Sequence, residues 1–238
     1  MEPLKNYRKE SMEAVIGNAF RYWYKTIFFQ LIFSLIYSIM LFIFISTAIK
    51  MLGLEETFHK FTLAVTKNSN PEAIAKKLER LLESQEVQYL MFFIIFIKAL
   101  LYPLNIGFFR IYNNMDLGIR PRVSDLFEGF RGNNFPIFFG YYLFWIVVSS
   151  LISYVNLGFV WVFFTFLISP ILFFQKCGII KAFKVNIQFL KIDFPMVLVG
   201  VLISLLFSYC GLLFFGIGLL LTFPFWNAMI YAVYKNMN

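Results

Sequence analysis

Residues 26–49 read TIFFQLIFSLIYSIMLFIFISTAI, a run of 24 residues without a charged side chain. A helix needs about 20 mainly apolar residues to cross the ~30 Å hydrocarbon core of a bilayer. Because the backbone of a lipid-exposed segment has to satisfy its own hydrogen bonds, this run is expected to be helical rather than extended. It predicts a transmembrane helix.

Five further stretches have the same apolar character, and the chain is therefore predicted to be an all-α, polytopic membrane protein with six transmembrane helices. The six expected spans are residues 26–49, 89–109, 135–154, 160–174, 194–209 and 212–234.

The composition leads to the same class of protein. Of the 238 residues, 60% are hydrophobic and 14% are charged, whereas soluble domains average about 45–50% apolar and about 25% charged residues. A protein of this size cannot bury such a surplus and still present a polar surface to water. The composition excludes a soluble globular fold and intrinsic disorder, and the two cysteines exclude a disulfide scaffold.

The distribution of lysine and arginine predicts the orientation. Fourteen of the 21 cations lie in the N-terminal segment, the second loop, the fourth loop and the C-terminus, and none lies in the third or fifth loop. The first loop, residues 50–88, carries six cations and six acids. Since cytoplasmic loops carry the excess of positive charge, both termini are expected in the cytoplasm.

A threefold pattern runs through the expected spans. A Phe-Pro pair opens the third span at 135–136 and the fifth at 194–195, and each even-numbered span carries one proline: Pro103, Pro170 and Pro224. Each odd-numbered span follows an amphipathic stretch, at residues 10–23, 123–131 and 179–192. We expect three helical hairpins, each preceded by an interfacial amphipathic helix. The alternative is that any loop between spans looks amphipathic.

The domain organisation follows from these elements. We expect a single membrane domain over residues 1–238, with a cytoplasmic amphipathic N-terminus (1–25), an extracytoplasmic helical insert (51–88) and cytoplasmic interfacial helices (110–134 and 175–193). Within the insert, Asn70 and Pro71 are typical of a helix start. A lone helix of that length is marginal in water, so the insert is a candidate for docking on a partner.

The stretch 179–192 predicts contacts with lipid. Its polar stripe is Lys181, Lys184, Gln188 and Lys191, and its opposite apolar face is Ile180, Phe183, Ile187 and Leu190. Cations beside apolar side chains favour binding to anionic lipid headgroups on the cytoplasmic side. An equal alternative is that these lysines only determine the topology of the chain. Binding to nucleic acid is not expected. The aromatic clusters Tyr22-Trp23-Tyr24 and Tyr231/Tyr234 are expected to be interfacial anchors.

Several motifs in the second half of the chain carry a family resemblance. Residues 123–130 read VSDLFEGF ahead of a span, and they are followed by Ser169-Pro170, by the run IKAF at 180–183, and by a glycine-rich hairpin from Gly211 to Pro224. This combination resembles the bacterial YciC-like multi-pass membrane proteins, which are related to the membrane domain attached to some glycerophosphodiester phosphodiesterases. The similarity covers residues 120–235 and implies a fold rather than a chemistry. We expect the bacterial inner membrane as the location.

The sequence predicts no enzyme. His59 is the only histidine, and Glu55 and Glu56 beside it are too few to complete a zinc site. The expected spans contain no Asp, Glu or His, and the chain has no G-x-S-x-G, H-E-x-x-H or P-loop motif. We expect no catalytic residue, no metal and no cofactor.

Lys98 is the one charged residue near the middle of an expected span. A charge at that depth costs about 2.5 kcal/mol or more, so a partner is expected: a carbonyl freed by Pro103, a lipid phosphate, or a residue of another protein. The alternative is that the span is misplaced and Lys98 lies nearer water.

These features predict a non-enzymatic inner-membrane protein that serves as an accessory or scaffold subunit of a larger envelope complex, with a protein partner in the membrane. The alternative is a passive carrier or lipid-handling protein. Its path would run between helices broken at Pro103, Pro170 and Pro224, with Asn105 and Asn227 as polar contacts.

Overall fold

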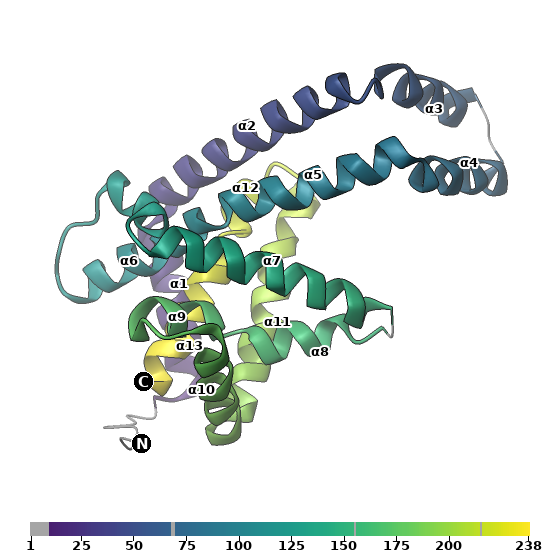
Figure 1. Cartoon of the computed structure of the whole chain (residues 1–238). Coiled ribbons are helices and arrows are strands. Elements are labelled where there is room, and N and C mark those ends of the chain that lie inside the picture. The colour runs from purple at the N-terminus through teal and green to yellow at the C-terminus, as the bar shows by residue number, and fades with distance from the viewer. Residues whose placement is uncertain (1–9, 68–69, 155, 215) are drawn as a thin grey trace. The chain divides into compact units, whose positions relative to one another are not determined.

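The computed structural model describes residues 10–67, 70–154, 156–214 and 216–238, and within these ranges the protein is helical and contains no strand (Figure 1). The contacts divide the chain into two compact units. Unit 1 comprises residues 1–35 and 102–238, and unit 2 comprises residues 36–101.

The helices are bounded as follows. The longer ones are α1 (Met12–Lys25), α2 (Ile27–Met51), α3 (Glu55–Lys67), α4 (Pro71–Glu83), α5 (Gln85–Leu101), α6 (Pro103–Asp116), α7 (Asn134–Ser153), α10 (Ile179–Ile192), α11 (Phe194–Cys210) and α13 (Phe225–Met237). The shorter ones are α8 (Gly158–Thr165), α9 (Ile168–Gln175), α12 (Leu219–Thr222) and the 3₁₀ helices η1 (Val123–Phe130) and η2 (Gly211–Phe214).

Within the described ranges, five helices are long and apolar enough to cross a membrane. They are Ile27–Met51, Gln85–Asp116, Asn134–Ser153, Gly158–Gln175 and Phe194–Leu213, which correspond to the first five expected spans. The protein is therefore a membrane-type helical protein with several spans.

The expected sixth span, 212–234, is not one long helix. Its described part contains the end of η2, the four residues of α12 and most of α13, and Phe215 lies outside the described residues. Pro224 precedes α13 directly, and a proline removes a backbone donor and collides with the preceding turn. This explains why the helix is divided at that residue.

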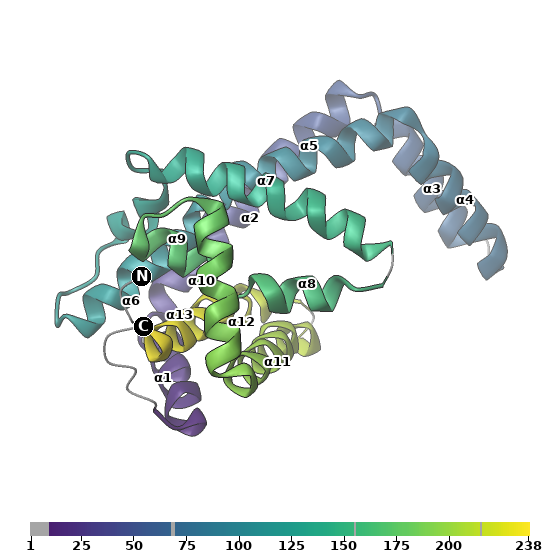
Figure 2. The same ribbon diagram turned by 60° about the horizontal axis from the view of Figure 1, so that its bottom comes forward.

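Helix α13 forms the centre of unit 1. It packs against α1, α6, α9 and α11 (Figures 1 and 2), and eleven of its thirteen residues are buried. Large aromatic side chains of the neighbouring helices are wholly buried, namely Tyr22, Tyr112, Phe108 and Phe109, and so is Phe225 of α13 itself.

The N-terminal amphipathic stretch forms a helix that packs against the rest of unit 1 with part of its apolar face. Helix α1 begins at Met12, with the Ser11 hydroxyl accepting from the backbone N–H of Ala14. Val15, Ala19 and Tyr22 are buried, and α1 packs along α13. The other apolar residues of the stripe, Met12, Ile16, Phe20 and Trp23, are partly buried.

The stretch 123–131 forms the 3₁₀ helix η1, which packs tightly on α6. Two glycines permit this close approach, because a Cβ on Gly107 would collide with the backbone of Leu126 and a Cβ on Gly129 with that of Pro103. Leu126 is wholly buried as a result.

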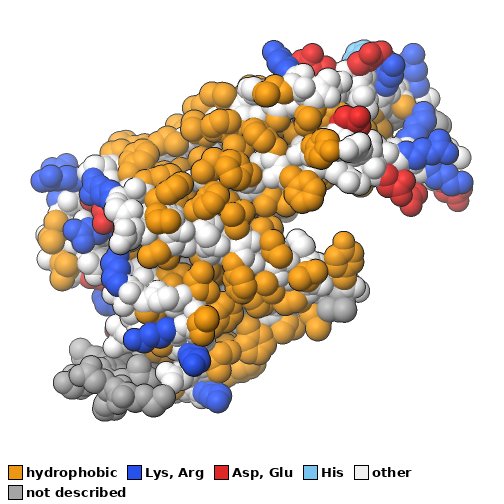
Figure 3. All heavy atoms as spheres, in the orientation of Figure 1, with side chains coloured by type: hydrophobic (Ala, Val, Ile, Leu, Met, Phe, Trp, Pro, Cys, Tyr) orange, Lys and Arg blue, Asp and Glu red, His pale blue; other side chains and the backbone are white. Residues whose placement is uncertain are grey.

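Unit 2 consists of the second part of α2 followed by α3, α4 and α5. Ala48, Leu54, Val87 and Leu90 form a small apolar core, with Leu81 packed against it. The expected cap is confirmed, since the Asn70 side chain accepts from the N–H of Glu72 at 3.0 Å. Charged side chains of both signs cover α3 and α4, while apolar side chains cover α2 and α5 (Figure 3).

Candidate functional site

Lys98 lies on α5 in unit 2 and its side chain is exposed. It lies in the last turn of α5, within the apolar segment Gln85–Asp116 that α5 and α6 form together, 13 residues after the first residue of that segment and 18 before the last. At 1.5 Å per residue, these ends are about 20 Å and about 27 Å away along the axis. None of the hydrogen bonds or ion pairs among the described residues includes Lys98.

Asn105 and Asn227, the polar contacts expected for a carrier, bind each other. The Asn227 side-chain amide donates to Oδ1 of Asn105 at 3.1 Å, joining α13 to α6. Pro103 begins α6 and Pro224 directly precedes α13, so each amide lies within one turn of a proline that interrupts an apolar segment. The Asn105 amide also donates to the carbonyl of Tyr102 at 3.3 Å. The pair is thus part of the hydrogen bonding at two helix breaks.

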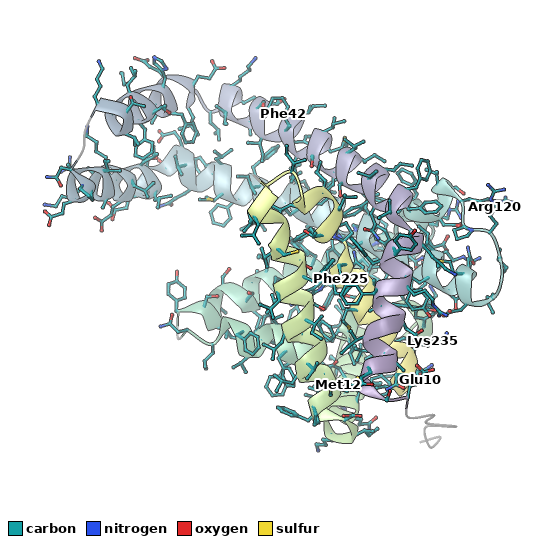
Figure 4. The ribbon with its side chains drawn as sticks, turned by 180° about the vertical axis from the view of Figure 1, so that it is seen from behind. Glu10, Met12, Phe42, Arg120, Phe225 and Lys235 are labelled. Carbon is teal, nitrogen blue, oxygen red and sulfur yellow. The ribbon has the colours of Figure 1, made fainter. Side chains whose placement is uncertain are left out.

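A carboxylate that the sequence did not single out joins three helices of unit 1. Asp116, at the end of α6, accepts from the hydroxyls of Tyr22 at 2.7 Å and Tyr231 at 2.8 Å. Lys235 Nζ lies 2.7 Å from the same carboxylate, and Arg21 Nη2 lies 3.9 Å from it. We refer to these five residues as the Asp116 cluster. Lys235 and Glu10 lie close together at this end of α13 (Figure 4), where Asn236 accepts from the Glu10 backbone.

The Asp116 cluster shifts the pKa values of Lys235 and Tyr22, which lie outside the expected spans. Burial alone would lower the pKa of Lys235, but its hydrogen bond to Asp116 and the adjacent negative charge outweigh burial, so the pKa is raised above its usual 10.5. Burial and the hydrogen bond to Asp116 also raise the pKa of the Tyr22 phenol above 10.0. Lys235 is therefore charged and Tyr22 neutral at physiological pH. The expectation that Tyr22 and Tyr231 are interfacial anchors was wrong, because both are buried and bonded to protein.

A second polar residue that the sequence analysis missed, Asn186, completes the backbone hydrogen bonding at a helix break. The apolar segment Gly158–Gln175 is interrupted between α8 and α9, three residues before Pro170. There the wholly buried Asn186 of α10 donates to the carbonyl of Phe164 at 2.6 Å and accepts from the N–H of Leu167 at 3.3 Å. Irregular backbone at membrane depth is tolerated where protein satisfies it in this way.

Asn186 also changes which face of α10 is buried. The buried residues are Ala182, Asn186, Phe189 and Leu190, whereas Ile180 is 77% exposed. The predicted apolar face was therefore only partly right, because the helix is rotated to bring the amide to the break. The expected polar stripe, Lys181, Lys184, Gln188 and Lys191, is exposed.

A hollow open to the surface lies between α7 and the first part of α10. It is lined by Phe144 of α7 and by residues between Gly178 and Lys184 of α10, and its volume is about 880 Å³. We call it the α10 groove. It brings Lys181 and Lys184 together with exposed apolar side chains, and Lys191 is not among its lining residues.

His59 is exposed on α3, and the neighbouring Glu56 pairs with Lys60 at 2.7 Å. In the part of the chain that the structure describes, no three side chains of His, Cys, Asp or Glu gather closely enough to hold a metal ion.

Comparison with known proteins gives no further assignment: no protein-family model matches the sequence, and no curated protein or solved structure matches the chain. The resemblance to the YciC-like proteins therefore stays a prediction.

Proposed function

We propose that this chain is a non-enzymatic membrane protein that acts as an accessory or scaffold subunit of a larger envelope complex. The observation that carries the proposal is Lys98, an exposed cation in the interior of the apolar segment Gln85–Asp116. A lysine at such depth costs about 2.5–3.5 kcal/mol unless a partner or water compensates it. A carboxylate on a neighbouring membrane protein would remove that cost.

The surroundings of Lys98 support a protein partner. Met91, seven residues before Lys98 and therefore on the same face of α5, is 48% exposed. Methionine is enriched at the centre of protein interfaces, where a charge pair is fully desolvated. The expected partner is a transmembrane helix that carries one Asp or Glu at the depth of Lys98.

The finer features of the topology belong to the same proposal. We propose six spans in three hairpins, with residues 212–234 crossing as a broken segment. The burial of α13 supports this, since a broken segment inside protein needs no contact with lipid. The distribution of lysine and arginine supports two cytoplasmic termini. The same distribution of lysine and arginine, together with the resemblance to the YciC-like proteins, supports the bacterial inner membrane as the location.

Co-purification in a mild detergent tests the subunit role. The tagged chain is purified as wild type, as Lys98→Leu and as Lys50→Leu, and bound proteins are quantified by mass spectrometry. Lys50 is an exposed lysine of unit 2 at the end of α2, so its replacement makes the same chemical change away from the middle of a span. We expect a stoichiometric partner that Lys98→Leu loses and Lys50→Leu keeps. A chain that purifies alone would overturn the proposal.

The alternative, a passive carrier or lipid-handling protein, rests on the asparagine pair beside two helix breaks. If Asn105 and Asn227 line a path, replacing either with alanine should abolish transport or lipid handling even in variants that fold. In the scaffold account the pair is structural. Asn105→Ala and Asn227→Ala then lower stability but keep the partner, which the same purification measures.

A further inference from the structure

We propose that the α10 groove is a binding site for one anionic phospholipid molecule, with its acyl chain against Phe144, Ile180 and Phe183 and its phosphate at Lys181 and Lys184. This inference is independent of the partner at Lys98, because the groove lies within unit 1 and Lys98 lies in unit 2.

The apolar half of the groove is held in place by contacts between aromatic rings. Phe183 packs edge-on against Phe144, with ring centroids 6.0 Å apart, and lies 5.8 Å from the ring of Trp161. Phe144 is still 42% exposed and Ile180 77% exposed. A hydrocarbon chain that covers these side chains in place of water removes apolar surface from water, which favours binding.

The charged half of the groove has a single sign. Lys181 and Lys184 are three residues apart on α10, so they lie on the same side of the helix. Both are exposed, and no ion pair among the described residues includes either. The lining contains no Asp or Glu. Two adjacent ammonium groups without a counter-charge complement a phosphodiester.

The two halves together select the occupant. A water-soluble anion would leave Phe144 and Ile180 uncovered, and a neutral apolar molecule would leave both lysines without a counter-charge. An amphiphile with an anionic head satisfies both, and anionic lipids attract basic segments of membrane proteins through the same electrostatics. Phosphatidylcholine fits less well, because its choline cation lies beside the phosphate.

Lipid titration of the purified full chain tests this assignment. The protein in neutral detergent is titrated with dioleoylphosphatidylglycerol or dioleoylphosphatidylcholine, and bound lipid is counted by native mass spectrometry. The variants are wild type, Lys181→Gln/Lys184→Gln and, as the matched control on the same exposed stripe, Lys191→Gln. At roughly fivefold per lysine, we expect the double variant to lose about 25-fold in phosphatidylglycerol affinity and the control to lose less than about twofold.

Two further arms test the acyl chain and the source of the phosphate. Ile180→Ser should weaken the dioleoyl lipid and leave a dihexanoyl analogue unchanged, while Ile192→Ser, at an exposed isoleucine of the same helix, should affect neither. Inorganic phosphate should not displace the bound lipid. A loss of about fivefold in Lys191→Gln, the same per lysine as in the double variant, would show diffuse attraction to the whole stripe and overturn the site. Displacement by phosphate would show a site for a free anion and overturn it as well.

Discussion

Removal of the Asp116 carboxylate should destabilise unit 1 far more than removal of either of its basic partners. Asp116→Ala breaks the hydrogen bonds from Tyr22 and Tyr231, which come from two different helices. A hydrogen bond to a charged group contributes about 1.5–3 kcal/mol. The side chain of Asp116 is 15% exposed, so water recovers part of the loss. We therefore expect Asp116→Ala to lower the free energy of unfolding by about 3–5 kcal/mol.

The comparison with Lys235 makes this prediction specific. The side chain of Lys235 is 51% exposed, and a half-exposed ion pair is worth about 0–1 kcal/mol. Lys235→Met should therefore cost about 1 kcal/mol or less, although Lys235 lies as close to Asp116 as the tyrosines do. Glu128→Ala is the matched control, because Glu128 pairs with the exposed Arg131.

Thermal unfolding in detergent, followed by tryptophan fluorescence, measures the difference. At about 2–4 °C per kcal/mol for a domain of this size, Asp116→Ala should lower the Tm by about 6–20 °C. Lys235→Met and Glu128→Ala should each lower it by less than about 4 °C. Equal shifts for Asp116→Ala and Glu128→Ala, or a larger shift for Lys235→Met, would refute the idea that the tyrosine hydrogen bonds hold the three helices together.

Three further variants test other parts of the structure. Gly107→Ala should prevent η1 from packing on α6 and shift the protein to aggregates in size-exclusion chromatography, whereas Gly140→Ala, where an added Cβ meets no atom within 4 Å, should leave it monodisperse. Asn186→Leu should cost about 2–5 kcal/mol in unfolding experiments because it leaves two backbone groups at the break unpaired, and the exposed Gln188→Leu should cost little. Because the pKa of Lys235 is raised in the folded protein, its contribution is complete below pH 10.5 and is lost as the pH rises through the raised value. The Tm of wild type should then fall more steeply than that of Lys235→Met between about pH 10 and 12; parallel curves would contradict this.

Much of the fold could be predicted because it depends on the length of the apolar stretches and on local preferences such as helix capping. Five expected spans correspond to helices of sufficient length, and Asn70 caps α4 as its type and position predict. The sixth segment showed the limit of this reasoning. Its hydropathy is that of a span, but Pro224 divides it, and burial of α13 in protein permits the division.

The polar residues could not be placed in the same way, because their partners are distant in the sequence. Asp116 and Tyr22 are 94 residues apart, and Asn227 and Asn105 are 122 apart. A carboxylate just after a span looks like an ordinary loop residue, and two tyrosines in aromatic clusters look like interfacial anchors. Asn186 gave one usable signal: an amide on the less polar side of an amphipathic helix, beside a neighbouring segment interrupted by Pro170.

Photo-crosslinking in living cells tests the central claim, that Lys98 contacts another protein within the membrane. A benzoylphenylalanine at position 95, one helical turn before Lys98, would report what lies beside the lysine. The account predicts one protein adduct of defined size, which disappears when Lys98→Leu is added and persists when Lys50→Leu is added. An adduct that Lys98→Leu leaves unchanged, or crosslinks to lipid alone, would contradict it.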